Sequence, residues 1–252
     1  MALGLQRIGY QRQSTPGNPN ADAAMSAIDP ARTALIVVDM QPDFMPGGPL
    51  PVAGAEDHGE RLVAPVRGLM ESDLLPLQVA TQDWHPPGHV SFASSHPGRA
   101  PFDGIEVHGY PQTLWPDHCV QGSPGAELHP RLPLARLAAI LRKGMDAQAD
   151  SYSGFHNNHG PNGARAPTGL AGYLRERGVV AVVCCGLARD FCVKWTAEDA
   201  AAAGFTSYVL WDLCWPVHPH SDARVRDEIQ ARGVHLLDRA ALADAVAMSG
   251  GA

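Results

Sequence analysis

The sequence predicts an α/β protein with an open, mainly parallel six-stranded sheet and helices on both faces, in a Rossmann-like three-layer arrangement. Two observations support this fold class: apolar runs of strand length recur along the chain, and helical patterns lie between them. Unbroken apolar runs are typical of strands that are buried on both faces of a parallel sheet. A regular alternation of strand and helix indicates parallel strands joined by right-handed crossovers.

Six apolar runs are the candidate strands, and most of them lead into a polar or charged residue. The first run reads Ala-Leu-Ile-Val-Val and ends at Asp39, and the third leads to Lys143. The six runs are residues 34–38, 77–80, 137–141, 179–183, 208–211 and 234–237. These positions define the expected order of strands along the chain.

Four helical patterns lie between or beside these runs. Thr168 and Ser221 are candidate N-caps, and the Ala-rich third pattern ends at Gly204. The first pattern is weaker because Pro65 interrupts it. The patterns cover residues 58–72, 168–178, 190–203 and 221–233.

The domain organisation follows from the position of the first strand. Residues 1–30 carry no periodicity and are expected to form a flexible N-terminal arm, with Met25 as an alternative native start. Residues 31–252 are expected to form a single domain, and a chain of 252 residues can bury a sizeable core without disulfides.

Composition excludes several functional classes. The chain has 19 basic and 26 acidic residues and a net charge of -7, which argues against nucleic-acid binding. No apolar run reaches the roughly 18 residues that a spanning helix needs, so we expect no membrane contact. The 5 cysteines are odd in number and irregularly spaced, which indicates a reducing compartment, the cytoplasm, rather than a disulfide framework.

Reactive residues gather at the predicted carboxyl edge of the sheet. Asp39, Asp83 and Lys143 follow three of the strands, and Cys192 follows a fourth after a short turn. Ligands of open parallel sheets bind at this edge. A carboxylate, a lysine and a cysteine on the same rim therefore predict a catalytic site.

Cys192 opens the Ala-rich helical pattern. The positive end of a helix dipole favours a thiolate, and the N–H groups there can hold an oxyanion. The alternative is that Cys192 is a small buried hydrophobic residue, as most free cysteines are. We expect Cys184 and Cys185, which end a buried strand, to be of this second kind.

A second cluster combines one carboxylate with imidazoles. Asp83 and His85 are two residues apart, His89 follows four residues later, and His118 lies in a distant segment. Such a set suits zinc, iron or manganese and leaves positions open for water or a ligand. The alternative is that these loop histidines have no role. Four further histidines are expected to be solvated: His156, His159, His218 and His220.

Several motifs carry a resemblance to a known family. Residues 38–44, Val-Asp-Met-Gln-Pro-Asp-Phe, resemble the VDxQxDF opening of the isochorismatase-like cysteine hydrolases. Residues 81–86 and 115–120 resemble the metal-site segments of the nicotinamidases in that superfamily. The other matching segments are residues 143–144, 152–155 and 186–193. The resemblance runs from about residue 33 to residue 238 and keeps the order of the motifs.

The resemblance implies a triad and an oxyanion hole. The triad maps onto Asp39, Lys143 and Cys192, and the backbone N–H groups of Ala188 and Cys192 are the implied oxyanion donors. In relatives the bond before that alanine is cis, so the resemblance implies a cis peptide between Leu187 and Ala188.

The resemblance also implies a metal site and a pocket. The implied ligands of one divalent ion, zinc first and iron or manganese as alternatives, are Asp83, His85 and His118. His89 is left open as an additional or water-bridged ligand. The residues that match the lining of the nicotinamide pocket are Phe44, Trp115 and Tyr152.

The implied activity is hydrolysis of nicotinamide to nicotinate and ammonia through a cysteine thioester, a step of NAD salvage. Another small amide, such as pyrazinamide, is the alternative substrate, and a non-catalytic binding protein on the same fold is the alternative class. The expected partner is this small molecule, and a homo-oligomer is left open. One residue departs from the family pattern: Arg189 stands where close relatives carry Thr, and we expect it to pair with Asp190 or to alter substrate preference.

Overall fold

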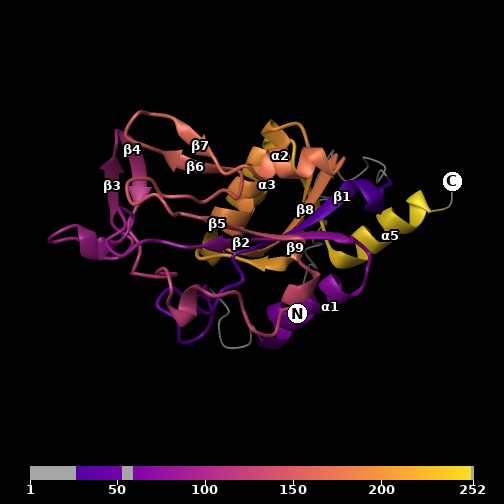
Figure 1. Ribbon diagram of the computed structural model, residues 1–252, viewed down its shortest axis with the longest axis horizontal. Helices are drawn as coiled ribbons and strands as arrows, with labels where there is room; N and C mark the ends of the chain where they lie inside the picture. Colours follow the sequence, from indigo (N-terminus) through magenta and orange to yellow (C-terminus); the bar gives the residue numbers. More distant parts are fainter. Residues whose placement is uncertain (1–26, 53–58, 251–252) are drawn as a thin grey trace, which may run out of the picture.

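The computed structural model, which describes residues 27–52 and 59–250, confirms the predicted α/β fold with a single six-stranded parallel sheet (Figure 1). The strands of this sheet are β1 (Thr33–Val38), β2 (Leu77–Asp83), β5 (Ala139–Lys143), β8 (Ala181–Leu187), β9 (Thr206–Trp215) and β10 (His235–Leu237). Their order across the sheet is β10-β9-β8-β1-β2-β5, and every neighbouring pair is parallel. All six predicted apolar runs are therefore strands of one sheet.

Helices cover both faces of the sheet. They are α1 (Ala64–Glu71), α2 (Leu170–Glu176), α3 (Lys194–Ala202), α4 (Asp222–Ala231) and α5 (Arg239–Ser249). In Figure 1, α2 and α3 lie on one face, and α1 and α5 lie on the other. The connection from β1 to β2 and the connection from β8 to β9 run in opposite directions across the sheet. Right-handed crossovers in opposite directions place their helices on opposite faces.

Pro65 does not interrupt the first helix, contrary to the sequence interpretation. It is in the first turn of α1, directly after a π-helical turn at Gly59–Val63. A proline is tolerated there because the N–H groups of the first turn have no partner within the α-helix.

Three elements escaped the sequence analysis. Helix α5 is capped at its N-terminus by Asp238, whose side chain accepts a hydrogen bond from the N–H of Ala241. Two hairpins interrupt segments that read as loops. They are formed by β3 (Gly104–Val107) with β4 (Tyr110–Thr113) and by β6 (His156–His159) with β7 (Arg165–Pro167).

The expected N-terminal arm is only partly within the described residues. Residues 1–26, including Met25, lie outside them. Ile28, near the end of the expected arm, is buried, and its N–H donates to the carbonyl of Ala245 at 3.0 Å. No helix within the two described ranges is long and apolar enough to cross a membrane.

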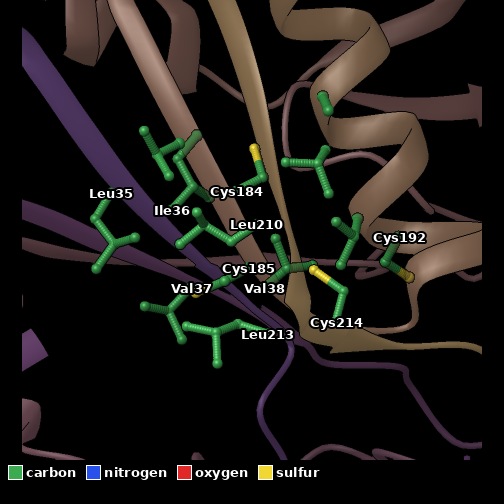
Figure 2. Packing of buried hydrophobic residues seen from close by; sticks show 14 of the residues in the cluster. Leu35, Ile36, Val37, Val38, Cys184, Cys185, Cys192, Leu210, Leu213 and Cys214 are labelled. Carbon is green, nitrogen blue, oxygen red and sulfur yellow. The ribbon is translucent and has the colours of Figure 1, made fainter. Parts of the chain in front are cut away.

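The hydrophobic core is centred on two neighbouring strands of the sheet, β1 and β8. All six residues of β1 are buried, as are all seven of β8. Figure 2 shows Cys184, Cys185 and Cys214 packed among the aliphatic side chains of these strands. Burial raises the pKa of Cys184 and Cys185, and both are unbonded thiols, as the sequence predicts.

The strands β1 and β8 meet at the topological switch point, where ligands of such folds bind. Gly186 of β8 pairs with Val38 of β1 and has a φ of 113°. A Cβ at position 186 would lie 2.2 Å from the carbonyl oxygen of Val38. Glycine is therefore required for the close approach of the two strands just before Asp39 and the turn that carries Cys192.

Candidate active site

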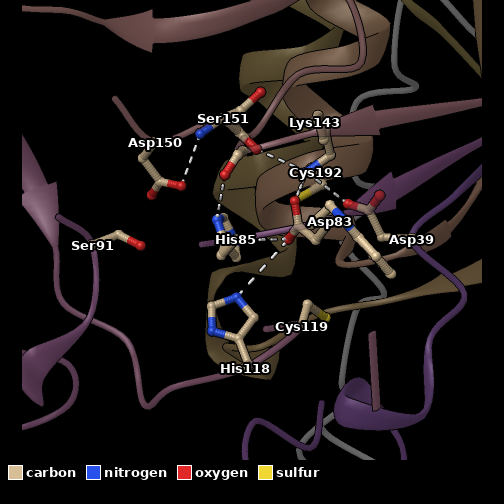
Figure 3. A network of polar contacts seen from close by, with 12 residues as sticks. Asp39, Asp83, His85, Ser91, His118, Cys119, Lys143, Asp150, Ser151 and Cys192 are labelled. Atoms are coloured by element: carbon tan, nitrogen blue, oxygen red, sulfur yellow. Dashed lines mark hydrogen bonds and ion pairs between the residues drawn. The ribbon is translucent and has the colours of Figure 1, made fainter. Parts of the chain in front are cut away.

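A buried lysine joins the three residues of the predicted triad. The Nζ of Lys143 lies 2.8 Å from Oδ2 of Asp39 and 3.4 Å from Sγ of Cys192 (Figure 3). It also donates to Oδ1 of Asp83 and, at 2.8 Å, to the carbonyl of Ser151. Residues from three different strand ends and one helix are thus brought together around a single ammonium group.

One carboxylate oxygen of Asp39 accepts a hydrogen bond, and the other accepts none from the described residues. Its Oδ1 accepts a hydrogen bond of 2.6 Å from the hydroxyl of Thr81. Its Oδ2 faces Lys143 as an ion pair without hydrogen-bond geometry. Ligand atoms of Asp39, Asp83 and Cys192 all lie within 4.8 Å of one another. The carboxylate can therefore receive the proton of the Cys192 thiol.

Burial dominates the protonation state of Asp39. It raises the pKa of this carboxyl from its ordinary 3.8 to about 6, against the opposing charge of Lys143 and with a further increase from Asp83. Asp39 is consequently still ionised at neutral pH, but it is a much stronger base than an exposed aspartate.

The surroundings of Cys192 favour the thiol over the thiolate, against the effect expected of a helix N-terminus. Burial raises its pKa well above the ordinary value, while Lys143 lowers the pKa and Asp39 and Asp83 raise it further. Cys192 also does not open an α-helix, because it is the fourth residue of a π-helical turn, Arg189–Val193, that precedes α3. A nearby base is therefore needed to form the nucleophile.

The turn before Cys192 has the backbone that the resemblance implied. The peptide between Leu187 and Ala188 is cis. The carbonyl of Ala188 accepts from the N–H groups of Phe191 and Val193, at 3.1 Å and 3.0 Å, and so closes the turn. The role of the Ala188 and Cys192 N–H groups as oxyanion donors stays a prediction.

Three predicted metal ligands converge. The Nε2 atoms of His85 and His118 lie 3.6 Å and 3.9 Å from Oδ2 of Asp83, and all three side chains are buried. The Nδ1 of His85 lies 3.1 Å from the carbonyl of Gly144, and the Nδ1 of His118 lies 2.8 Å from that of Pro116. A backbone carbonyl at Nδ1 fixes the tautomer that leaves Nε2 free for a metal.

The charges in this group also suit a cation. Burial alone would raise the pKa of Asp83, but Lys143 and His85 lower it well below its ordinary range. Burial and His85 lower the pKa of His118 to about 4, while Asp83 raises the pKa of His85 against the effect of burial. A divalent metal binds a carboxylate and neutral imidazoles, so Asp83 and His118 are already in the forms that bind, whereas His85, whose pKa is raised, would release a proton on metal binding.

His89 belongs to a neighbouring group rather than to this one. Its Nδ1 lies 2.8 Å from the hydroxyl of Ser91, and its Nε2 lies 3.4 Å from the carbonyl of Ala149. Its ring centroid is 4.3 Å from that of His85. Potential ligand atoms of His85, His89 and Asp150 lie within 4.8 Å of one another. A ligand role for His89 stays a prediction.

Two motif residues to which the sequence analysis assigned no role hold the metal-site segments in place. Gln41 donates to the carbonyl of Asp83 and accepts from its N–H, each at 2.8 Å, much as a neighbouring strand would. Asp43 accepts a 2.6 Å hydrogen bond from the N–H of Cys119, next to His118. The sequence did contain a signal for these two roles, because Gln41 and Asp43 are the Gln and the second Asp of the VDxQxDF motif.

A small, partly open cavity is lined by Cys192 and the metal-site group. The three predicted pocket residues, Phe44, Trp115 and Tyr152, all line it. The lining residues that the sequence analysis did not select are Leu50, Asp150, Phe191 and Val217. The Nε1 of Trp115 donates to the Tyr152 hydroxyl at 3.3 Å, which fixes two of the aromatic walls against each other.

Arg189 neither pairs with Asp190 nor lines the cavity. Its guanidinium donates to the carboxylate of Asp222 and, at 2.8 Å, to the carbonyl of Cys214. Asp190 instead accepts 2.8 Å hydrogen bonds from the N–H groups of Val217 and His218. The two side chains thus tie the turn that carries Cys192 to the end of β9 and the segment that follows it.

The four histidines expected to be solvated divide into two pairs. His218 and His220 are exposed, as predicted, whereas His156 and His159 are half-buried. The Nδ1 of His156 lies 3.4 Å from Asp199, and the ring of His159 stacks on Tyr110 at 3.6 Å. His156 and His159 are half-buried because they lie on β6, a hairpin strand that the sequence analysis did not predict.

Comparison with known families places this geometry among enzymes. Residues 105–241 match the isochorismatase domain family. The chain is 50% identical over 181 residues to a nicotinamidase of Acinetobacter baylyi, covering 72% of this chain and 80% of that protein. It is 40% identical over 208 residues to a nicotinamidase of Escherichia coli, covering 81% and 93%.

Solved structures give the same result. A nicotinamidase and pyrazinamidase of Acinetobacter baumanii matches with a TM-score of 0.75 and 41% identity, covering 82% of this chain and 96% of that one. The yeast nicotinamidase bound to nicotinaldehyde matches with a TM-score of 0.74 and 30% identity, covering 82% and 100%. A pyrazinamidase of Pyrococcus horikoshii in complex with zinc matches with a TM-score of 0.64 and 36% identity, covering 82% and 99%.

Proposed function

The chain belongs to the isochorismatase family, among its nicotinamidases, and we propose that it hydrolyses nicotinamide to nicotinate and ammonia through a thioester on Cys192. The observation that carries this proposal is the placement of Cys192, beside both Asp39 and Lys143, in the lining of a small aromatic cavity that also contains Asp83, His85 and His118. The proposed nucleophile and ligand set therefore face the same cavity, and the proposed base is buried beside the nucleophile.

Asp39 serves as the base and then as the acid. It takes the thiol proton of Cys192, and the sulfur attacks the amide carbon to form a C–S bond. The C–N bond then breaks, and the same proton goes to the leaving amine, so that ammonia departs and a thioester remains. Asp39 next removes a proton from water, whose oxygen displaces the sulfur to give the carboxylic acid and the free thiol, and the acid ionises to nicotinate.

Two features of the chain stabilise charge along this path. Lys143 keeps the Asp39 carboxylate in place and compensates its charge, and it lies within hydrogen-bond distance of the Cys192 sulfur. The N–H groups of Ala188 and Cys192 are the proposed oxyanion donors. Loss of one such donor costs about 3–4 kcal/mol of transition-state stabilisation in comparable enzymes.

Asp83, His85 and His118 would hold one divalent ion, zinc first and iron or manganese as alternatives. When bound, that ion supplies a Lewis-acidic point that can hold the pyridine nitrogen of nicotinamide. The aromatic walls Phe44 and Trp115 then confine the ring, so that the carboxamide is presented to Cys192. Restriction of the substrate in this way lowers the entropic barrier to attack.

An ammonia-release assay with nicotinamide tests the proposal. We expect the wild-type chain to release ammonia, exhaustive chelation to reduce the rate strongly, and readdition of zinc, iron or manganese to restore it. Cys192→Ala should remove turnover without unfolding the protein. Cys184→Ala is the matched control, because this thiol is also buried but lies in the core of the sheet. Normal turnover by Cys192→Ala would exclude the thioester route.

Pyrazinamide is the second candidate substrate, because a curated relative of Mycobacterium tuberculosis, 36% identical over 207 residues, is named a nicotinamidase and pyrazinamidase. A comparison of kcat/KM for the two amides decides between them. A purely binding role on this fold would require ligand uptake without ammonia release. The cytoplasmic location, the link to NAD salvage and a homo-oligomer stay predictions.

A further inference from the structure

Asp150 is a buried carboxylate in the cavity wall that neither the proposed triad nor the proposed ligand set uses. It is 4% exposed and lines the cavity together with Asp83. Its Oδ1 accepts from the N–H of Ser151 at 2.8 Å (Figure 3). Its Oδ2 accepts from Nε2 of Gln112 at 2.7 Å. Both partners are uncharged. Among the described residues, no Lys or Arg forms an ion pair with Asp150.

The buried charges around the cavity are unequal. Asp39, Asp83 and Asp150 are three carboxylates, and the one buried ammonium near them is Lys143. Lys143 already contacts Asp39 and Asp83. With all three carboxylates ionised and the neighbouring histidines in the neutral form that binds a metal, the group carries a formal charge of -2. Buried charges in proteins are paired or bind a metal, so this excess is suited to one divalent cation.

The position of Asp150 places its charge beside the metal-site group. One of its oxygens and ring nitrogens of His85 and His89 lie within 4.8 Å of one another, and His85 is one of the three proposed ligands. Gln112 of the β3–β4 hairpin holds the carboxylate from the outer side. The hairpin thus contacts this part of the site through the amide of Gln112, whose Nε2 also lies 3.1 Å from the Tyr152 hydroxyl.

We propose that Asp150 is a charge-balancing and positioning residue of the metal centre. Asp150 increases the affinity of the centre for a divalent ion but does not coordinate the ion. The inference rests on the proposed function only in taking Asp83, His85 and His118 as the ligands. Carboxylates beyond the ligands commonly contribute 10–100-fold to metal affinity. An uncharged side chain of the same size at position 150 is expected to lose about this much.

Zinc affinity of the metal-free protein, measured by competition with a chromophoric chelator, tests the proposal. We expect Asp150→Asn to bind zinc about 10–100-fold more weakly than the wild-type chain. The matched control is Asp146→Asn, which removes the same charge from an exposed position in the same loop. It should bind zinc within about twofold of wild type. Unchanged zinc affinity in Asp150→Asn would overturn the proposal.

A second variant separates charge from structural support. Gln112→Met removes the hydrogen-bond donor but keeps the Asp150 carboxylate, so we expect its zinc affinity to stay close to wild type. An equal loss in Gln112→Met and Asp150→Asn would assign the effect to the hydrogen-bond network and overturn the proposal. Thermal unfolding of each metal-free variant checks the fold, and Asp150→Ser replaces Asp150→Asn if the latter does not fold.

The measurement also distinguishes this inference from the proposed function. Weaker zinc binding by Asp150→Asn, together with no ammonia release from nicotinamide by the wild-type chain, supports the inference and rejects the function. Ammonia release by the wild-type chain, together with unchanged zinc affinity in Asp150→Asn, rejects the inference alone.

Discussion

Burial of single residues sets the protonation states on which the proposed reaction depends. Asp39 and Cys192 are both buried, and burial raises both pKa values. The thiol becomes harder to ionise, but the carboxylate beside it becomes a better acceptor of its proton. Because both pKa values are raised, we expect the nucleophilic thiolate to form by transfer of the Cys192 proton to Asp39.

The pH dependence of the reaction tests the shift in Asp39. Because the base must be ionised, we expect kcat/KM for nicotinamide to fall as pH decreases through about 6, by about tenfold per pH unit below it. An apparent pKa near 4 for this limb would contradict the structural account. Asp39→Asn should retain little activity and should not show this limb.

The raised pKa of Asp39 makes this residue a better base, but it also makes the contribution of Asp39 to folding stability decrease as pH rises. The folded pKa of Asp39, about 6, lies above its ordinary value of 3.8. Folding therefore favours the protonated carboxyl. The contribution of this residue to stability is fully present below the ordinary pKa and is lost as pH rises through the folded pKa. The pH at which Asp39 is an active base is thus the pH at which it contributes least to stability.

Two neighbouring elements, β1 and β8, determine how closely the base and the nucleophile turn approach. Their contact at the switch point depends on Gly186, where a Cβ would collide with the backbone of Val38 rather than with a mobile side chain. The turn after β8 is fastened in addition by Arg189 and Asp190. The strand pair and the turn therefore act as one rigid support.

Gly186→Ala tests this support. We expect it to lower the free energy of unfolding by clearly more than about 1–2 kcal/mol, the cost of left-handed backbone alone, because the strands must also separate. Gly204→Ala is the matched control, since Gly204 has a φ of 91° but no atom within 4 Å of an added Cβ. Urea unfolding measures both. An equal loss of unfolding free energy in Gly186→Ala and Gly204→Ala would show that the close contact between β1 and β8 adds nothing to the cost of the substitution.

At the scale of the whole molecule, the proposed metal links segments that are distant in sequence. Asp83 ends β2, His85 follows it, and His118 comes from the segment after the β3–β4 hairpin. An ion bound by all three would connect the sheet to that segment. Binding to the folded chain alone stabilises it by mass action.

Metal binding should therefore be visible in global stability. At free zinc a hundredfold above Kd, we expect a gain of about 2.7 kcal/mol, and chelation should lower Tm accordingly. His118→Ala removes one of the three proposed ligands, so its Tm should respond much less to zinc. A zinc-induced shift of equal size in His118→Ala at the same zinc concentration would show that the ion binds elsewhere.

Tertiary structure was needed where burial or distant neighbours decide the outcome. The direction of the Arg189 side chain depends on Asp222 and the end of β9, which lie more than twenty residues later in the sequence. The half-buried state of His156 and His159 depends on a hairpin whose strands are only four and three residues long. Short polar strands have no apolar periodicity by which to recognise them.

The apolar pattern of the chain was enough to predict the sheet and the edge on which its reactive residues lie, because apolar runs mark buried strands and the carboxyl ends of parallel strands meet at one edge. Asp39, Asp83 and Lys143 could be placed on that edge for this reason. By contrast, the folded structure was needed to see that burial favours the thiol form of Cys192 and that Asp150 lines the cavity. Those properties depend on the electrostatic environment that the folded chain creates, and its charges come from segments far apart in sequence.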